Sequence, residues 1–294
     1  MNLLSAFFHG LGGLLYPPFC TVCGGGTQVG SGGEAILGGH GGQLCEACAK
    51  SVEGARSGGG HAGGGHAGGG GGFSSSVSRG TACIRCSRVF SGAISSAGCC
   101  AECLRRRPAF GCAVAPFILR GVLREVVHQF KYEGKRHLRF ILAGWMAEGL
   151  GDPRLRAPPP EVLVPVPLHW SRQFARGFNQ AELLAHALAE LSPGLRPYER
   201  AHSERALRLP VERMLRRVRD TGTQTVLSRG ERLGNLRGAF ALGRGALGRG
   251  AGVSGRHVLL VDDVLTTGAT LDACARVLLS AGAASVRALS VARG

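Results

Sequence analysis

Residues 258–283 read VLLVDDVLTTGATLDACARVLLSAGA, and this stretch decides the fold of the carboxy-terminal half of the chain. Its first four residues, Val258 to Val261, are all apolar, as is typical of a strand buried on both faces of a parallel sheet. From Leu271 onward, apolar residues recur at helical spacing. The stretch therefore predicts a strand, a loop and a helix, with Asp262 and Asp263 at the carboxyl end of the strand, where open α/β sheets bind ligands.

The loop between this strand and this helix has the chemistry of a phosphate site. A helix start offers unpaired N–H groups and a partial positive charge, and a glycine lets the backbone approach a ligand closely. Carboxylates beside a phosphate accept hydrogen bonds from sugar hydroxyls or face Mg²⁺, so the pattern suggests a sugar phosphate. The simpler alternative is a threonine-capped helix start beside two solvated acids. The loop residues are Thr266, Thr267, Gly268, Ala269 and Thr270.

Composition favours anionic partners. The 294 residues include 35 lysines and arginines but only 19 aspartates and glutamates, a formal net charge of +16, which favours phosphates, nucleotides or nucleic acid. The stretch at 258–283 has neither the lysine of a Walker loop nor the glycine pattern of a dinucleotide-binding turn. Met1 to Tyr16 is apolar but too short and glycine-broken to span a membrane, so we expect a short helix packed on the body. Without a secretory signal, we expect a cytoplasmic protein.

Eight of the eleven cysteines form four C-x-x-C pairs. Two such pairs can hold one Zn²⁺ tetrahedrally, so the sequence predicts two closed, structural zinc ribbons. A thiol redox role is the alternative. Cys99 could replace its neighbour as a ligand, but it would break the two-residue spacing. The predicted ligands are Cys20, Cys23, Cys45 and Cys48 in the first group, and Cys83, Cys86, Cys100 and Cys103 in the second.

A glycine-rich tract separates the two cysteine groups. Its central part, GGGHAGGGHAGGGGG, has too few apolar residues to build a hydrophobic core. We therefore expect a disordered insertion at about residues 54–80. We therefore expect residues 1–110 to form a double zinc-ribbon region and residues 111–294 to form a sheet domain with its own core. On this division, replacing Cys83 should unfold its ribbon and leave the distant loop at 266–270 able to bind.

Two amphipathic helices are predicted after Pro116. Apolar residues recur on one face from Val122 to Phe130, the pattern breaks at Gly134, and it resumes from Leu138. Lys131 ends the first of these helices. It either faces a ligand or is a solvated basic residue that complements the helix dipole.

A second strand, loop and helix unit follows. A strand is predicted from Val162 to Val166, and a helix begins near Asn179. The loop between them is rich in groups that suit phosphate oxygens, above all guanidinium groups, although an arginine-rich helix entry that contacts only the sheet rim is the alternative. The candidate residues are Arg172, Arg176, Gly177, Asn179 and Gln180.

The stretch RRVRDTGTQTVLSRGERLGNLRGAF at residues 216–240 shows little apolar periodicity. We expect a mobile segment, in which Arg217, Thr223 and Gln224 are candidates for ligand contacts. A plain connecting loop with solvated arginines is the alternative.

These motifs together resemble the ComF family, whose members join an amino-terminal zinc-ribbon region to a carboxy-terminal type I phosphoribosyltransferase domain. The apolar run, the two acids and the T-T-G-A-T loop resemble the phosphoribosyl pyrophosphate (PRPP) signature of type I enzymes. The HQFKYEGK, R-G-F-N-Q and N-L-R-G-A-F stretches resemble further motifs of the family. The resemblance implies a parallel sheet flanked by helices, as the alternating pattern also predicts.

The resemblance also implies an activity, namely Mg²⁺-dependent transfer of a phosphoribosyl group from PRPP to an acceptor, with release of pyrophosphate. The two acids would then hold the ribose hydroxyls, the loop at 266–270 the 5′-phosphate, and the turn around Arg176 the pyrophosphate, while the segment around Gln224 would close over the ligand. The acceptor cannot be read, because the base-recognising hood of type I enzymes has no recognisable counterpart. The alternative is a non-catalytic zinc-ribbon protein of DNA uptake that binds single-stranded DNA and a nucleotide-like ligand.

Overall fold

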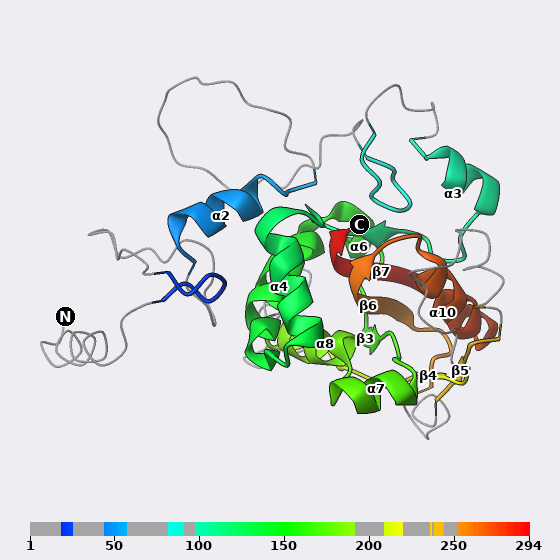
Figure 1. The fold of residues 1–294 in the computed structure, drawn as a ribbon. Coiled ribbons are helices and arrows are strands. Elements are labelled where there is room, and N and C mark those ends of the chain that lie inside the picture. The colour runs from blue at the N-terminus through cyan, green and yellow to red at the C-terminus, as the bar shows by residue number, and fades with distance from the viewer. Residues whose placement is uncertain are drawn as a thin grey trace, which may run out of the picture.

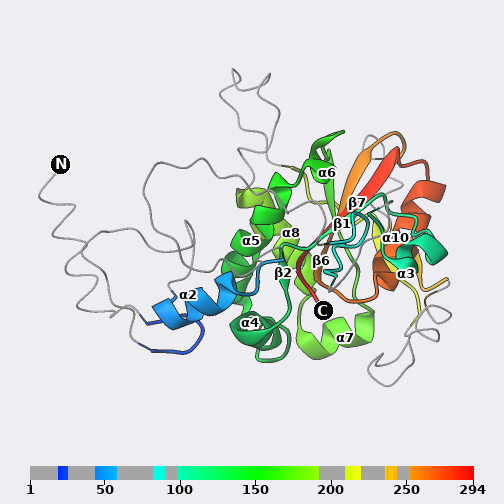
Figure 2. The same ribbon diagram turned by 90° about the horizontal axis from the view of Figure 1, so that it is seen from above.

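The computed structural model describes residues 19–25, 44–57, 82–90, 98–191, 209–219, 236, 238–243 and 252–294. The predicted helix from Met1 to Tyr16 lies outside the described residues, as do Thr223 and Gln224 and most of the glycine-rich insertion. Figure 1 shows a sheet with helices on both sides, and Figure 2 shows the same arrangement from above.

A parallel sheet of five strands forms the centre of the molecule. The strands are β1 (Ala113–Val114), β2 (Phe117–Ile118), β3 (Val162–Pro165), β6 (His257–Leu265) and β7 (Ser285–Arg293). They run in the order β1-β7-β6-β3, and β2 also pairs with β7. Every pairing in this sheet is parallel. The predicted α/β class is therefore confirmed, and the apolar run at 258–261 is the buried centre of β6.

Two layers of helices cover the sheet. On one face lie α4 (Gly121–Tyr132), α5 (Arg139–Glu148) and α8 (Gln180–Leu191), which pack on Leu259 and Val261 of β6. On the other face lies α10 (Ala269–Ser280), which packs on Val258 and Leu260. Because side chains alternate along a strand, β6 contributes to both cores, which explains its continuous apolar run.

The shorter elements complete the described chain. The predicted helix pair after Pro116 is confirmed as α4 and α5, and Gly134 breaks it in a left-handed conformation with φ of 67°. Two short strands pair antiparallel, so the ends of the segment expected to be mobile are held in a ribbon. No helix in the described ranges is long and apolar enough to cross a membrane. The remaining elements are α2 (Glu46–Glu53), α3 (Ala101–Arg106), η1 (Arg136–Leu138), η2 (Gly149–Gly151), α6 (Pro153–Arg156), α7 (Trp170–Arg176), β4 (Leu215–Arg217) and β5 (Phe240–Leu242).

Candidate functional site

The two acids lie within β6 rather than after it. The strand was expected to end at Val261, where its pairing with β3 does end, but β7 continues alongside β6 as far as Leu265. The acids are therefore strand residues that project beyond the end of β3. Strand alternation puts Asp263 on the face covered by α4 and Asp262 on the face covered by α10.

Lys131 is the partner of Asp263. Its Nζ lies 3.0 Å from Asp263 Oδ1, and both side chains are largely buried, with exposed fractions of 19% and 13%. Burial acts to lower the pKa of Lys131, but the carboxylates of Asp263 and Asp262 outweigh it and raise that pKa. The lysine therefore ends α4 as a buried cation against the acids, and not as a solvated side chain.

Asp262 has an unusual charge state. Burial, and then the negative charge of Asp263, raise its pKa to about 7, while the charges of Lys131 and Arg217 act in the opposite direction. Its Oδ1 accepts a hydrogen bond from the Asp263 N–H at 2.9 Å. A carboxyl with such a pKa is about half ionised at neutral pH, so a ligand that donates hydrogen bonds to it, or a cation, would complete its ionisation.

The T-T-G loop is the entry to α10. Gly268 is the N-cap residue and has a φ of 76°, a left-handed conformation that favours glycine. Thr267 Oγ1 accepts a hydrogen bond from the Ala269 N–H at 3.3 Å. Thr266 is exposed and Thr270 is half-buried. The loop thus presents three threonine hydroxyls and the start of a 12-residue helix at the sheet edge where the acids lie.

The arginines of the second predicted loop lie in a helix. Arg172 and Arg176 belong to α7, whereas the sequence predicts a loop up to Asn179. The His169 side chain accepts a hydrogen bond from the Ser171 N–H and so starts this helix, and Gly177, with a φ of 75°, ends it. The expected helix after Asn179 is α8, and Asn179 caps it by accepting from the Ala181 N–H at 3.1 Å.

The turn at 177–180 is fixed against the end of α4. Arg136 Nη2 donates to the Gly177 carbonyl at 3.3 Å, and the positive φ of Gly177 is what favours glycine at this position. Arg176 stacks over the Tyr132 ring at 4.9 Å and donates to Gln180 Oε1 at 3.2 Å. The turn and Lys131 are therefore brought together. Sequence reasoning missed Tyr132 and Arg136, although Tyr132 lies within the HQFKYEGK stretch and Arg136 directly follows it.

The eight predicted cysteines form two groups, and the four sulfur atoms of each lie within 4.8 Å of one another. Cys23 Sγ lies 3.7 Å from Cys45 Sγ in the first group, and Cys86 Sγ lies 3.8 Å from Cys100 Sγ in the second. Zn–S bonds of about 2.3 Å in a tetrahedron separate neighbouring sulfurs by about 3.8 Å, so both groups fit a metal ion. The second group contains Cys100, as predicted, and not Cys99.

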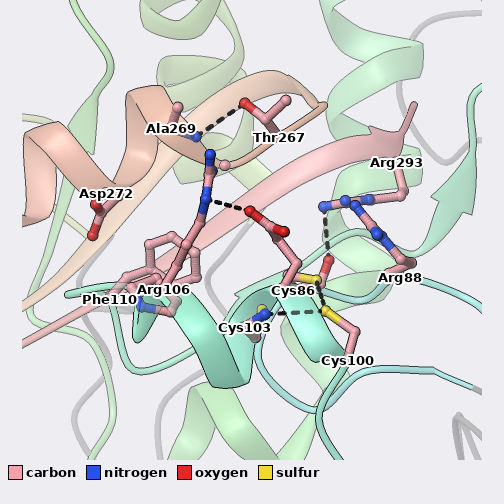
Figure 3. A pocket seen from close by; sticks show the side chains of 13 residues that line it. Cys86, Arg88, Cys100, Cys103, Arg106, Phe110, Thr267, Ala269, Asp272 and Arg293 are labelled. Carbon is pink, nitrogen blue, oxygen red and sulfur yellow. Dashed lines mark hydrogen bonds and ion pairs between the residues drawn. The ribbon is translucent and has the colours of Figure 1, made fainter. Parts of the chain in front are cut away.

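The second cysteine group does not lie far from the T-T-G loop, and the expectation of a distant loop is wrong. Figure 3 shows the pocket that they share. Its cysteine wall also carries arginines, and its other wall is the start of α10. Asp262, Asp263 and Lys131 lie outside this lining. The lining consists of Cys86, Arg88, Cys100, Glu102, Cys103, Arg106, Pro108, Phe110, Thr267, Gly268, Ala269, Asp272 and Arg293.

Comparisons with known proteins agree with this architecture. Residues 207–294 match the family model for the phosphoribosyl transferase domain. Competence protein F of Haemophilus influenzae is 30% identical over 197 residues, which cover 66% of this chain and 78% of that protein. This chain belongs to the competence protein F family. Two further relatives are similar to this competence protein F family member, over different lengths. DNA utilization protein YhgH of Escherichia coli K12 is 32% identical over 196 residues, or 66% of this chain and 77% of that protein. Competence protein ComFC of Bacillus subtilis is 34% identical over 135 residues, or 45% and 44%.

The family assignment confirms the resemblance read from the sequence. The match to the phosphoribosyl transferase domain includes β6, the T-T-G loop and α10. Lys131 precedes the matched residues, so its place beside Asp263 comes from the geometry alone.

Proposed function

We propose that the chain binds PRPP with Mg²⁺ at the sheet edge formed by residues 262–270 and transfers its phosphoribosyl group to an acceptor, with release of pyrophosphate. The observation that carries this proposal is the buried pair of Asp263 and Lys131 beside Asp262 and the T-T-G loop. Carboxylates there suit ribose hydroxyls, and the helix start suits a 5′-phosphate. The match to the phosphoribosyl transferase domain supports the same assignment.

In the proposed reaction the bond between ribose C1 and pyrophosphate breaks, and the acceptor forms a new bond to C1. Mg²⁺, when bound with PRPP, would neutralise charge on the pyrophosphate. Arg176, which Tyr132 and Gln180 hold in place, is the candidate for a further cation at the leaving group. The acids would stabilise the positive charge that develops on the ribose ring. The predicted substrate contacts of Arg172, Asn179 and Gln180 belong to the same proposal.

Calorimetric titration should show that PRPP binds more tightly with Mg²⁺ than without it. PRPP should also bind at least about tenfold more tightly than inorganic phosphate, because the acids add contacts to the ribose. Glu190→Gln, which removes an exposed acid of α8, should bind PRPP like the wild type. If PRPP and inorganic phosphate bound equally at the same salt concentration, the ribose contacts would be absent. A screen of acceptors for pyrophosphate release follows from a positive titration.

We further propose that each cysteine group holds one structural Zn²⁺. The ligands are the four cysteines of each group, and the fit of the sulfur–sulfur distances supports this proposal. The Cys100 N–H donates to Cys83 Sγ at 3.3 Å, and the Cys103 N–H donates to Cys100 Sγ at 3.4 Å, contacts that favour thiolates. The division into a zinc-ribbon region at 1–110 and a transferase-like domain at 111–294 remains part of this proposal.

A second candidate function is binding of single-stranded DNA, and the surface of α7 favours it. Every side chain of α7 is exposed or half-buried, and Trp170 and Phe174, one turn apart, have exposed fractions of 73% and 89%. Tyr132, which is 62% exposed, stacks against Arg176 at the end of the same helix. Exposed rings beside arginines suit stacking of successive bases. The names of the relatives, competence and DNA utilization proteins, agree with this candidate.

Replacing both Trp170 and Phe174 by alanine should weaken binding of a single-stranded oligonucleotide by about tenfold or more, because each stacked base contributes about 1–3 kcal/mol. Wild-type affinity should fall steeply as salt rises, which fluorescence anisotropy measures directly. Phe19→Ala removes another exposed ring, 58% exposed, and is the control. Equal losses in both variants, or binding that salt does not affect, would argue against the α7 surface.

A further inference from the structure

The pocket between the second cysteine group and the T-T-G loop joins two parts of the chain that the sequence separates. Phe110 is 2% exposed and packs beneath the loop, since a Cβ on Gly268 would lie 3.5 Å from its Cζ. Only six residues separate Phe110 from Cys103. The chain that leaves the cysteine group therefore forms the floor of the loop (Figure 3).

Two of the hydrogen bonds that hold this arrangement lie closest to the loop and to β6. Asp272, in the first turn of α10, accepts from the Ala109 N–H through Oδ1 at 2.6 Å. Arg293, at the end of β7, is 6% exposed and donates through Nη1 to the Cys86 carbonyl at 3.0 Å. The cysteine segment is thus bound to the helix that starts at the loop and to the strand that runs beside β6.

The cysteine segment has little apolar surface with which to hold itself in this place. Among the described residues, its cluster consists of five cysteines, with Phe90 packed against it. A segment of this kind depends on metal binding for its fold, because the binding free energy of the metal is also its folding free energy. Loss of the metal would therefore release the segment and the cysteine wall of the pocket beside Gly268, although Phe110 itself packs in the core of the sheet.

The first cysteine group is placed differently. Cys20 and Cys48 pack in the core cluster that also holds residues of α4, and α2 lies against α4. The pocket beside the loop is lined by cysteines of the second group. The two groups, although alike in spacing, therefore face different parts of the molecule.

We propose that metal binding at the second cysteine group orders the T-T-G loop, so that phosphate binding at the loop depends on the metal of the second group and not on that of the first. Cys83, Cys86, Cys100 and Cys103 are positioning residues in this scheme, because they act through the pocket wall beside the loop and through the hydrogen bond from Ala109 to Asp272. The inference rests on the proposed phosphate role of the loop.

Cys103→Ser and Cys48→Ser form a matched pair for the test. Each variant removes the last cysteine of its group, which is buried in the first turn of a helix. Cys103 lies in α3 and Cys48 in α2. Metal analysis should find one zinc ion fewer in each variant. Cys103→Ser should bind inorganic phosphate about tenfold more weakly, the effect of losing a hydrogen bond to a charged group, whereas Cys48→Ser should match the wild type. Equal affinity in all three proteins, or equal losses in both variants, would overturn the proposal.

Two further measurements keep the test decisive. Asp272→Ala cuts the tie to Ala109 and leaves all eight cysteines in place, so it should retain both metal ions and still weaken phosphate binding. Hydrogen exchange of the Ala269 and Thr270 amides should speed up in Cys103→Ser and not in Cys48→Ser. This exchange result does not depend on PRPP, so a wild type that failed to bind PRPP would refute the proposed function alone. Unchanged exchange in Cys103→Ser would refute the ordering of the loop.

Discussion

Replacing Lys131 by methionine is expected to lower the free energy of unfolding by about 3 kcal/mol at pH 8, as removal of one partner from a buried ion pair does. Lys131 Nζ lies 3.0 Å from Asp263 Oδ1. The charge of Lys131 also acts on Asp262, the chain neighbour of Asp263. Without the lysine, two neighbouring carboxylates would share a largely buried edge of the sheet. Denaturant unfolding of the wild type and the variant measures the difference.

The loss should depend on pH in a defined direction. A carboxyl whose pKa is higher in the folded than in the unfolded protein costs stability as pH rises from its unfolded to its folded pKa. Asp262 already behaves in this way, with a pKa raised to about 7, and removal of Lys131 removes a charge that opposes this rise. The deficit of Lys131→Met should therefore be largest near pH 8 and shrink toward pH 5.

Two variants control for simple loss of a lysine. Lys50→Met removes an exposed lysine that pairs with exposed Glu46, and should change stability by less than about 1 kcal/mol. The double variant Lys131→Met with Asp263→Asn leaves no unpaired charge at Asp263 and should regain part of the loss. If Lys131→Met unfolded like the wild type at pH 8, Asp263 would not depend on this partner.

The sequence predicts the strand, loop and helix at 258–283 because local physics decides that stretch. A strand buried on both faces must be apolar at successive positions, and a helix that covers it must repeat every three to four residues. The end of β6 could not be predicted in the same way. It depends on β7, whose pairing with β6 continues from Val261 to Leu265 after β3 has ended.

The candidate site was predicted in its parts but not in its assembly. The sequence left Lys131 as either a ligand residue or a solvated helix end, and only its contact with Asp263 decides between burial and exposure. The arginines of α7 look like loop residues, because the cap at His169 and the stop at Gly177 lie in a stretch with few apolar positions. Contacts between distant segments leave no periodic signal.

The placing of the second cysteine group is the clearest case. The bond from Arg293 to Cys86 joins residues 207 positions apart in the chain. Cysteine spacing predicts which sulfurs share a metal ion, since both pairs of each group lie close in sequence. It carries no information about the surface on which the metal site packs. The sequence therefore could not show that the second cysteine group packs beside the loop. The two line one pocket.

Asp263→Asn should weaken PRPP binding by about tenfold or more while inorganic phosphate or sulfate binds as well as before, because in the proposed binding mode the lost charge faces ribose hydroxyls and not the phosphate. Release of Lys131 from its carboxylate partner would, if anything, favour an anion. Thr267→Val should weaken both ligands. It removes a hydroxyl from the anion site, at about 1–3 kcal/mol for a hydrogen bond to a charged group. Titration of both ligands into both variants at fixed salt measures these losses.

The pair of variants separates two chemical roles that a single variant cannot separate. Glu190→Gln repeats the charge change of Asp263→Asn on the exposed face of α8, so any effect it shares with Asp263→Asn reflects net charge alone. A general loss of folding would weaken the binding of both ligands in both variants. It would therefore also weaken phosphate binding in Asp263→Asn. If PRPP bound the wild type and both variants equally, the acids and the loop would not contact it. The signature would then persist here without its ligand, and binding of single-stranded DNA on α7 would become the better account of the chain.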